Sequence, residues 1–276
     1  MLFLPFVASA VLAASVNTDS VNADLDQPVL LTNAVLAAEP APTQEEEEEE
    51  PVGIFFGQVT IGGTYTEGNT ERRTASVAID AIKNYKNTDR LTLGFNWNFN
   101  QQEDANGSSI ARRIEGRAKY DISIDDRSYV WLNAFAQTDK PIDDTLPTLD
   151  LRYSAGVGYG YRVLDNDVWK WGLEAGLAFF NEEYQDQDED DYLSARIASI
   201  SSWQYSENTS FSNYIELYPS LDESDDVYGR SDTRATTNLT ESMIGQLQWI
   251  WDYDNTPAAD RDRSDHLFLV TVGWGF

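Results

Sequence analysis

The chain has 276 residues, with 19 Lys and Arg against 47 Asp and Glu, so its formal net charge at pH 7 is −28. Nucleic-acid binders need clustered basic side chains, and this excess of acid argues against such a partner. The sequence contains no cysteine, which excludes disulfide bonds, thiol catalysis and Cys-ligated metal centres.

The N-terminal region predicts export. Residues 1–14 form an apolar stretch that ends in small residues, as in a signal peptide. The Lys or Arg expected at the start of a signal peptide is missing. The cleavage site is predicted near Ala14, but Val35-Leu36-Ala37-Ala38-Glu39 also resembles a cleavage site. Residues 15–56 are polar and acidic and include six consecutive glutamates, Glu45–Glu50, which predicts a disordered linker.

A domain of alternating apolar and polar residues follows at 57–276. No apolar run after residue 14 reaches the roughly 18 residues that a membrane helix requires, whereas alternation with period two predicts strands with one apolar face. Leu91, Leu93 and Phe95, for example, alternate with Thr92 and Gly94. Twelve such strands are predicted, near 57–66, 71–83, 90–101, 109–121, 127–138, 149–162, 168–180, 191–204, 208–219, 229–239, 243–254 and 265–276.

The connections between these strands favour a membrane barrel. Those after even-numbered strands are short, whereas most of those after odd-numbered strands are predicted to be longer and acidic, as at Asn181–Asp191. Outer-membrane barrels have short periplasmic turns and longer outer loops. A soluble barrel would place the apolar face inward, but twelve strands leave an interior that side chains hardly fill. The predicted fold is therefore an all-β, transmembrane, antiparallel up-and-down β-barrel in the outer membrane of a bacterium.

The last strand carries a candidate assembly signal. Val270, Val272, Trp274 and Phe276 alternate with smaller residues, and the chain ends on the aromatic residue. Outer-membrane barrels commonly end this way, so Trp274 and Phe276 are predicted to be read by the barrel assembly machinery. The other expected partners are outer-membrane lipid and lipopolysaccharide.

Four short motifs in order resemble a known family. They are Gly62-Gly63-Thr64 with Glu67-Gly68-Asn69-Thr70, Arg152-Tyr153 with Gly156, Gly158, Gly160 and Tyr161, Trp171-Gly172-Leu173-Glu174-Ala175-Gly176, and Tyr253-Asp254-Asn255-Thr256-Pro257. From Gly57 to Phe276 the chain resembles the salt-induced outer-membrane proteins, a bacterial domain family of unassigned function. The resemblance implies an outer-membrane β-barrel and supplies no chemistry.

The predicted outer loops are rich in carboxylates, which are the ligands that Ca²⁺ and Mg²⁺ prefer. The run that begins at Asp186 is not an EF-hand loop, because Asp191 stands where glycine is needed. We therefore favour a diffuse acidic surface that binds Ca²⁺ or Mg²⁺ weakly and bridges to lipopolysaccharide, and we predict no other cofactor. The candidate cation-binding residues are Asp186, Asp188, Glu189, Asp190, Asp191, Asp222, Asp225 and Asp226.

A second set of charges lies on the predicted inner face. It would act either as the charge filter of a pore or as a plug of ion pairs, and the plug is favoured because twelve strands fall short of the wide porins. This lumen set comprises Arg113, Glu115, Arg117, Lys119, Arg152, Arg162, Lys170, Glu174, Arg196 and Glu216.

Two further patterns concern the outward face. Ser264 and His266 have the spacing used by outer-membrane lipases, but no third residue is evident to orient the histidine. The tryptophans are expected in interfacial girdles; they are Trp97, Trp131, Trp169, Trp171, Trp203, Trp249, Trp251 and Trp274.

The sequence therefore predicts a non-enzymatic envelope barrel with a structural or binding role and acidic loops that respond to cations or salt. The alternatives are a narrow channel for ions or small solutes and, second, a lipid-facing hydrolase.

Overall fold

The structure is a computed structural model that describes residues 53, 55–66, 71–85, 88–104, 107–143, 145–223, 225–258 and 261–276. The predicted signal peptide at 1–14 lies outside the described residues, as does the predicted linker apart from positions 53, 55 and 56. Among the described residues, no helix is long and apolar enough to cross a membrane.

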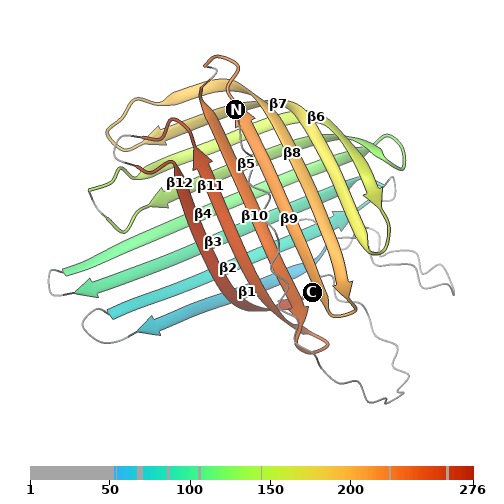
Figure 1. Ribbon diagram of the computed structural model, residues 1–276, viewed down its shortest axis with the longest axis horizontal. Coiled ribbons are helices and arrows are strands. Elements are labelled where there is room, and N and C mark those ends of the chain that lie inside the picture. Colours follow the sequence, from blue (N-terminus) through green and yellow to red (C-terminus); the bar gives the residue numbers. More distant parts are fainter. Residues whose placement is uncertain are drawn as a thin grey trace, which may run out of the picture.

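Twelve strands make up the described fold (Figure 1). Their bounds agree closely with the segments of alternating residues, because the alternation extends over almost the whole of each strand. They are β1 (Phe55–Thr66), β2 (Glu71–Asn84), β3 (Arg90–Asp104), β4 (Gly107–Ser123), β5 (Ser128–Lys140), β6 (Leu149–Asp165), β7 (Trp169–Tyr184), β8 (Asp190–Ser206), β9 (Thr209–Pro219), β10 (Val227–Asn238), β11 (Met243–Asp254) and β12 (Ser264–Gly275).

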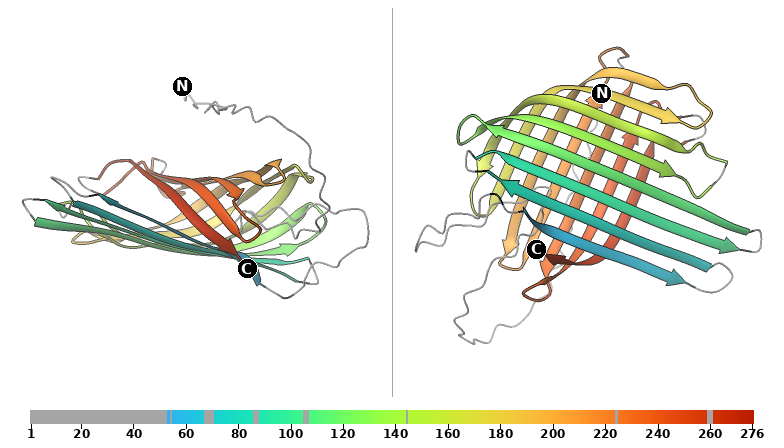
Figure 2. Two further views of the ribbon diagram at one scale, coloured as in Figure 1. Left: turned by 90° about the horizontal axis from the view of Figure 1, so that it is seen from below. Right: turned by 180° about the vertical axis from the view of Figure 1, so that it is seen from behind.

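The strands close into one antiparallel barrel in chain order, because β1 pairs with β12 as well as with β2. The last residue completes the seam: the Phe276 and Gly57 backbones exchange two hydrogen bonds, each 2.9 Å long. The left view of Figure 2 shows a flattened barrel, and the right view shows the strands of its two walls crossing at a steep angle. The predicted all-β, antiparallel up-and-down barrel is confirmed.

The connections gather by parity at the two ends of the barrel (Figure 1). Connections that follow even-numbered strands form the turn end, and those that follow odd-numbered strands form the loop end. The prediction of a long connection after the third strand was wrong, because β3 continues to Asp104 and β4 begins at Gly107. The acidic stretch 181–191 is likewise mostly strand, since β7 ends at Tyr184 and β8 begins at Asp190. Backbone hydrogen bonds extend these ladders beyond the apolar alternation.

The two faces of the wall differ in polarity. Large apolar side chains point outward, with Phe268 and Val270 exposed by 72% and 74%. Polar and charged side chains predominate on the inner face, where Arg196, Ser194 and Thr236 are fully buried, together with aromatic residues such as Phe180. An apolar outer wall around a polar interior is the arrangement that lipid requires of a membrane barrel.

Aromatic side chains form stacked groups at both ends of the outer wall. Near the turn end, the ring of Trp203 stacks on Trp169 and Phe211, with centroid distances of 5.2 and 5.5 Å. Near the loop end, the ring of His266 stacks on Trp249 and Trp251, at 5.9 and 6.4 Å. Such groups are typical of interfacial girdles.

Trp131 is an exception to the girdle prediction, which was wrong for this residue. Its side chain is fully buried and lies inside the barrel. A Cβ atom added to Gly158 would come within 2.3 Å of the Trp131 ring, and one added to Gly176 within 2.6 Å. The glycines on the inner faces of β6 and β7 therefore make room for a ring that projects from β5.

Candidate functional site: the charged lumen

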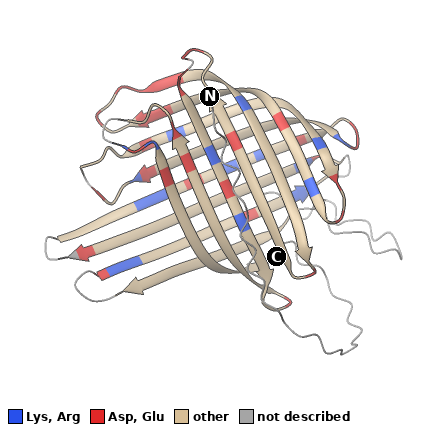
Figure 3. Cartoon of the chain, in the orientation of Figure 1, with Lys and Arg blue, Asp and Glu red and all other residues tan. Residues whose placement is uncertain are grey.

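All ten predicted lumen residues lie on the inner face of the barrel. They alternate with outward residues along β4, β6, β7, β8 and β9, because successive side chains of a strand point to opposite sides. Figure 3 shows that charged residues recur along the strands as well as at their ends. The lumen, rather than a loop, is therefore where the chain concentrates buried charge.

Direct ion pairs join opposite walls of the barrel. Arg230 on β10 donates to both carboxylate oxygens of Glu115 on β4, at 2.9 and 2.7 Å, and to Asp252 on β11 at 2.9 Å. The two neighbouring arginines on β4 flank Glu115: Arg113 lies 3.5 Å and Arg117 2.9 Å from its oxygens. In the strand order, β4 and β10 stand on opposite sides of the closed barrel. The contact between Arg230 and Glu115 therefore crosses the lumen from one wall to the other.

A second cluster is centred on Arg196 of β8. Its guanidinium lies 2.9 Å from Glu174 of β7 and 3.3 Å from Glu216 of β9, and it donates to the Tyr214 hydroxyl at 2.5 Å. The same group lies over the ring of Trp131, with the central carbon 4.5 Å from the ring centroid. This is a cation–π contact between the inward ring of Trp131 and the buried guanidinium.

Two other basic residues link the Arg196 cluster to β4. Lys119 forms ion pairs with Glu174 and, at 2.8 Å, with Asp121, and Arg117 lies 3.4 Å from Glu216. Most of the predicted lumen residues are thus connected through shared carboxylates.

Further ion pairs extend the network along the barrel. Arg152 forms ion pairs with Glu182 and, at 3.3 Å, with Asp254. Arg234 lies 2.6 Å from Asp80 of β2 and 2.8 Å from Asp232. Of these six residues, only Arg152 belongs to the predicted set.

Sequence reasoning missed about half of the network. On β10, Arg230, Asp232 and Arg234 alternate with small residues rather than large apolar ones, so the apolar alternation that identified the other inner faces is weak there. Alternation of charge alone would have located them. The missed residues are Asp80, Glu182, Arg230, Asp232, Arg234, Asp252 and Asp254, with the buried tyrosines Tyr214, Tyr218 and Tyr228.

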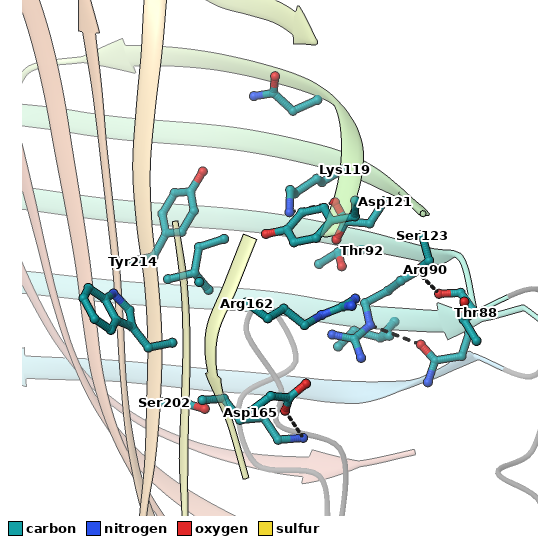
Figure 4. Close-up of a pocket in the computed structure, with 18 of the residues that line it drawn as sticks. Thr88, Arg90, Thr92, Lys119, Asp121, Ser123, Arg162, Asp165, Ser202 and Tyr214 are labelled. Carbon is teal, nitrogen blue, oxygen red and sulfur yellow. Dashed lines mark hydrogen bonds and ion pairs between the residues drawn. The ribbon is translucent and has the colours of Figure 1, made fainter. Parts of the chain in front are cut away.

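The turn end of the lumen holds a cavity of about 920 Å³, which we call the vestibule (Figure 4). The turn residues Thr88, Asp125 and Asp126 contribute to its lining, and Arg117 and Glu216 form part of its inner end. On the other side of the ion pairs, a hollow of about 20 Å³ is lined by Arg113, Arg152 and Asp252, among others. Glu115 lies between these spaces, because it binds Arg113 on one side and Arg117 on the other.

At the turn end, the carboxylate of Asp125 has a shifted pKa. The backbone N–H groups of Arg127 and Ser128 both donate to Asp125, each at 2.8 Å. These donors stabilise the charged form and lower the pKa of Asp125 below its ordinary value of 3.8.

The eight candidate cation-binding acids lie at the loop end but do not converge. Asp186, Asp188 and Glu189 lie in the connection after β7, Asp190 and Asp191 begin β8, and Asp222, Asp225 and Asp226 lie in the connection after β9. Several accept protein donors: Glu189 accepts from Asn181 at 2.6 Å, and Asp226 from Thr256 at 2.6 Å. Within the described ranges, no three acidic or histidine side chains are placed to hold a metal ion.

Ser264 and His266 approach one another on the outer wall but in an unfavourable arrangement for hydrolysis. The Ser264 Oγ lies 3.5 Å from the His266 Nε2, while the indole N–H of Trp249 donates to the His266 Nδ1 at 3.3 Å. A neutral imidazole whose Nδ1 accepts a hydrogen bond carries its proton on Nε2. That nitrogen then cannot remove a proton from the serine, as a general base must.

The predicted assembly residues lie at the seam of the barrel. Trp274 and Phe276 are exposed by 44% and 57%, and Trp274 is paired with Val59 of β1 and Met243 of β11. Their rings are accessible from outside, as recognition of the C-terminal strand would require.

Comparison with known proteins identifies a family. The family model described as "Protein of unknown function, DUF481" matches residues 59–276, and no curated protein matches the chain. Among solved structures, the translocator domain of the autotransporter NalP from Neisseria meningitidis is 12% identical, with 82% of this chain and 90% of that chain covered and a TM-score of 0.43. The NanC porin is 11% identical, with 79% of this chain and 98% of that chain covered and a TM-score of 0.46. The Pseudomonas putida toluene transporter TodX is 9% identical, with 80% of this chain and 88% of that chain covered and a TM-score of 0.35. Likeness at this level carries no functional argument.

Proposed function

Because the chain belongs to this family of unknown function, DUF481, we propose its role from its own geometry: it is a non-enzymatic barrel of the bacterial outer membrane whose lumen is closed by ion pairs. Its role in the envelope is structural or binding. The apolar outer wall and the aromatic groups at both ends support the membrane location.

The contact between Arg230 and Glu115 is the observation that supports a closed lumen. Both side chains are almost fully buried, and together they span the barrel from one wall to the other. Charge filters of open pores leave a continuous path between the lining charges. Here oppositely charged side chains contact each other directly, so each carboxylate is neutralised by an arginine that also occupies the path.

A narrow channel is the second candidate, and the vestibule is the observation that favours it. A cavity of about 920 Å³ reaches the lumen from the turn end. It would serve a channel only if the pairs between Arg230, Glu115 and Asp252 opened. Such opening requires breaking buried ion pairs, each of which is costly when one partner is left unpaired.

The loops and the last strand have proposed partners. The acidic loop end would respond to salt through screening of repulsion between carboxylates, and Ca²⁺ or Mg²⁺ would bridge it weakly to lipopolysaccharide. Trp274 and Phe276 would be bound by the barrel assembly machinery before the seam between β1 and β12 closes.

A liposome-swelling assay tests the proposed function. The full chain is refolded into liposomes, and uptake of arabinose is compared with liposomes that contain an open porin. We expect no swelling above that of empty liposomes, with correct folding checked by heat-modifiable electrophoretic mobility. Swelling by the wild-type protein would support the channel instead.

A further inference from the structure

The vestibule has the features of a ligand site rather than of packing space. Its volume of about 920 Å³ lies within the roughly 300–1,000 Å³ of small-molecule pockets. The lining combines basic and acidic side chains with aromatic rings and hydroxyl groups; the acidic residues are Asp121, Asp125, Asp126, Asp165 and Glu216. The basic residues are Arg90, Arg117, Lys119, Arg162 and Lys170, and the aromatic and hydroxyl residues include Tyr85, Tyr129, Trp171, Thr92, Ser123 and Ser202.

Arg162 lines the vestibule and forms no ion pair with a carboxylate of the described residues. Among the described residues, its guanidinium donates to the Asp126 carbonyl oxygen at 3.1 Å and lies 5.1 Å from the centroid of the Tyr129 ring, and no carboxylate forms an ion pair with it. Asp125 lies near enough to be influenced by Arg162, but its carboxylate already accepts two backbone N–H groups.

A second arginine extends into the same space. Figure 4 shows the side chains of Arg90 and Arg162 directed towards one another from β3 and β6. The Nε of Arg90 donates to Asn84 at 3.2 Å. Two guanidinium groups that face one space repel each other, and an anion between them would remove that repulsion.

An unsatisfied donor lies at the inner end of the vestibule. Arg117 uses Nε for Glu115 and Nη1 for Glu216, while its Nη2 is buried and has no hydrogen-bond partner in the described part of the chain. Buried guanidinium donors are normally satisfied, since leaving one unpaired is costly. Arg117 therefore brings a buried and unpaired donor group to this end of the cavity.

We propose that the vestibule binds a small organic oxyanion, a carboxylate or a phosphate ester, that enters from the turn end. Arg162 and Arg90 hold the charged group, the Tyr129 ring contacts the body of the ligand, and the hydroxyls of the lining bind its polar substituents. Arginine suits this role because its planar fork matches both carboxylate and phosphate oxygens. The site rests on the proposed closed barrel, since the ion pairs that fill the lumen form its inner end.

Calorimetry with phenyl phosphate and inorganic phosphate tests this assignment on the full chain in a non-ionic sugar detergent. We expect phenyl phosphate to bind more tightly than inorganic phosphate, because its ring adds contact with Tyr129. Arg162→Gln should weaken phenyl phosphate binding at least tenfold, and Arg162→Lys, which keeps the charge but loses the fork, should weaken it less. Arg127→Gln is the matched control, because Arg127 lies in a turn at the same end but does not line the cavity.

The results of these binding measurements distinguish failure of the proposal, the source of the oxyanion and failure of the closed-barrel function. Absence of phenyl phosphate binding to the folded wild-type protein, or an equal loss in Arg162→Gln and Arg127→Gln, would overturn the proposal. Competition by phosphatidylglycerol added to the micelles would identify a lipid headgroup as the source of the oxyanion, and its absence a soluble ligand. If the wild-type barrel admitted solutes while Arg162-dependent binding persisted, the closed-barrel function would fail and the binding site would stand.

Discussion

The Nη2 of Arg230 on β10 lies 2.7 Å from the Oε2 of Glu115 on β4, and these two strands stand on opposite sides of the barrel. Both side chains are shielded from solvent, with exposed fractions of 0% and 1%. A single ion pair thus connects two walls that are more than a hundred residues apart in the chain.

Replacement of Arg230 should destabilise the barrel strongly. Arg230→Ala leaves Glu115 and Asp252 buried with one cation fewer, and loss of one partner from a buried pair costs about 3–5 kcal/mol. The free energy of unfolding, measured by urea titration in detergent, should fall by that amount. Arg73→Ala is the control, because the pair of Arg73 with Glu71 is exposed by 54% and 37%, and exposed pairs contribute about 0–1 kcal/mol. Equal losses in both variants would contradict this account of the lumen.

Replacement of Gly158, on the inner face of β6, by alanine should destabilise the barrel. The added Cβ of Gly158→Ala would lie 2.3 Å from both the Trp131 ring and the Ala175 carbonyl oxygen, and overpacking of this kind costs about 1–3 kcal/mol. Gly172→Ala, on the inner face of β7, is the control, since its nearest atoms lie at 3.6 Å. We expect the urea midpoint to drop for the first variant and to stay near wild type for the second.

Asp125 should make the stability of the barrel depend on pH. Backbone N–H donors lower its pKa in the folded state below 3.8, so the folded protein binds this proton less readily than the unfolded chain. The resulting stabilisation is present above the unfolded pKa and is lost as the pH falls through the lowered, folded pKa. Asp125→Asn should therefore be less stable than wild type at pH 7, and the difference should shrink below pH 3.8. Asp126→Asn controls for the loss of one charge, and a difference that persists unchanged in acid would refute this origin.

The outer wall should show no serine hydrolase chemistry. The indole of Trp249 holds the His266 Nδ1 as an acceptor, which leaves the proton on the nitrogen that faces Ser264. We expect Ser264→Ala and His266→Ala to leave the background release of fatty acid from a fluorogenic phospholipid unchanged, with Ca²⁺ present. Release by the wild-type protein that disappears in Ser264→Ala would show that the dyad is active.

The fold was predictable because alternate residues of each strand face two different environments and differ in polarity accordingly. Lipid accepts only apolar side chains, so Leu91, Leu93 and Phe95 mark the outer face of β3, and the arginines of β4 mark the inner one. The strand ends were less predictable, since backbone pairing continued through the acidic residues of β7 and β8. Trp131 was misplaced because a tryptophan inside the barrel and one in a girdle share the same local sequence pattern.

The partners inside the lumen could not be predicted in the same way. Alternation shows that Glu115 faces inward but not that it meets Arg230, because that contact depends on how the closed barrel is flattened. The vestibule likewise follows from where large and small side chains meet across the barrel. For Arg162, the sequence indicated that the side chain faces inward but not that it lines a cavity.

Single-channel recording tests the closed lumen most directly. The full chain is reconstituted in a planar bilayer, with Glu115→Gln as a variant that weakens its ion pairs with the arginines around it. The account predicts no discrete conductance steps for the wild-type protein and measurable openings for the variant. Steady, discrete steps from correctly folded wild-type barrels would contradict it, because an ion path would then exist beside the pair of Arg230 and Glu115.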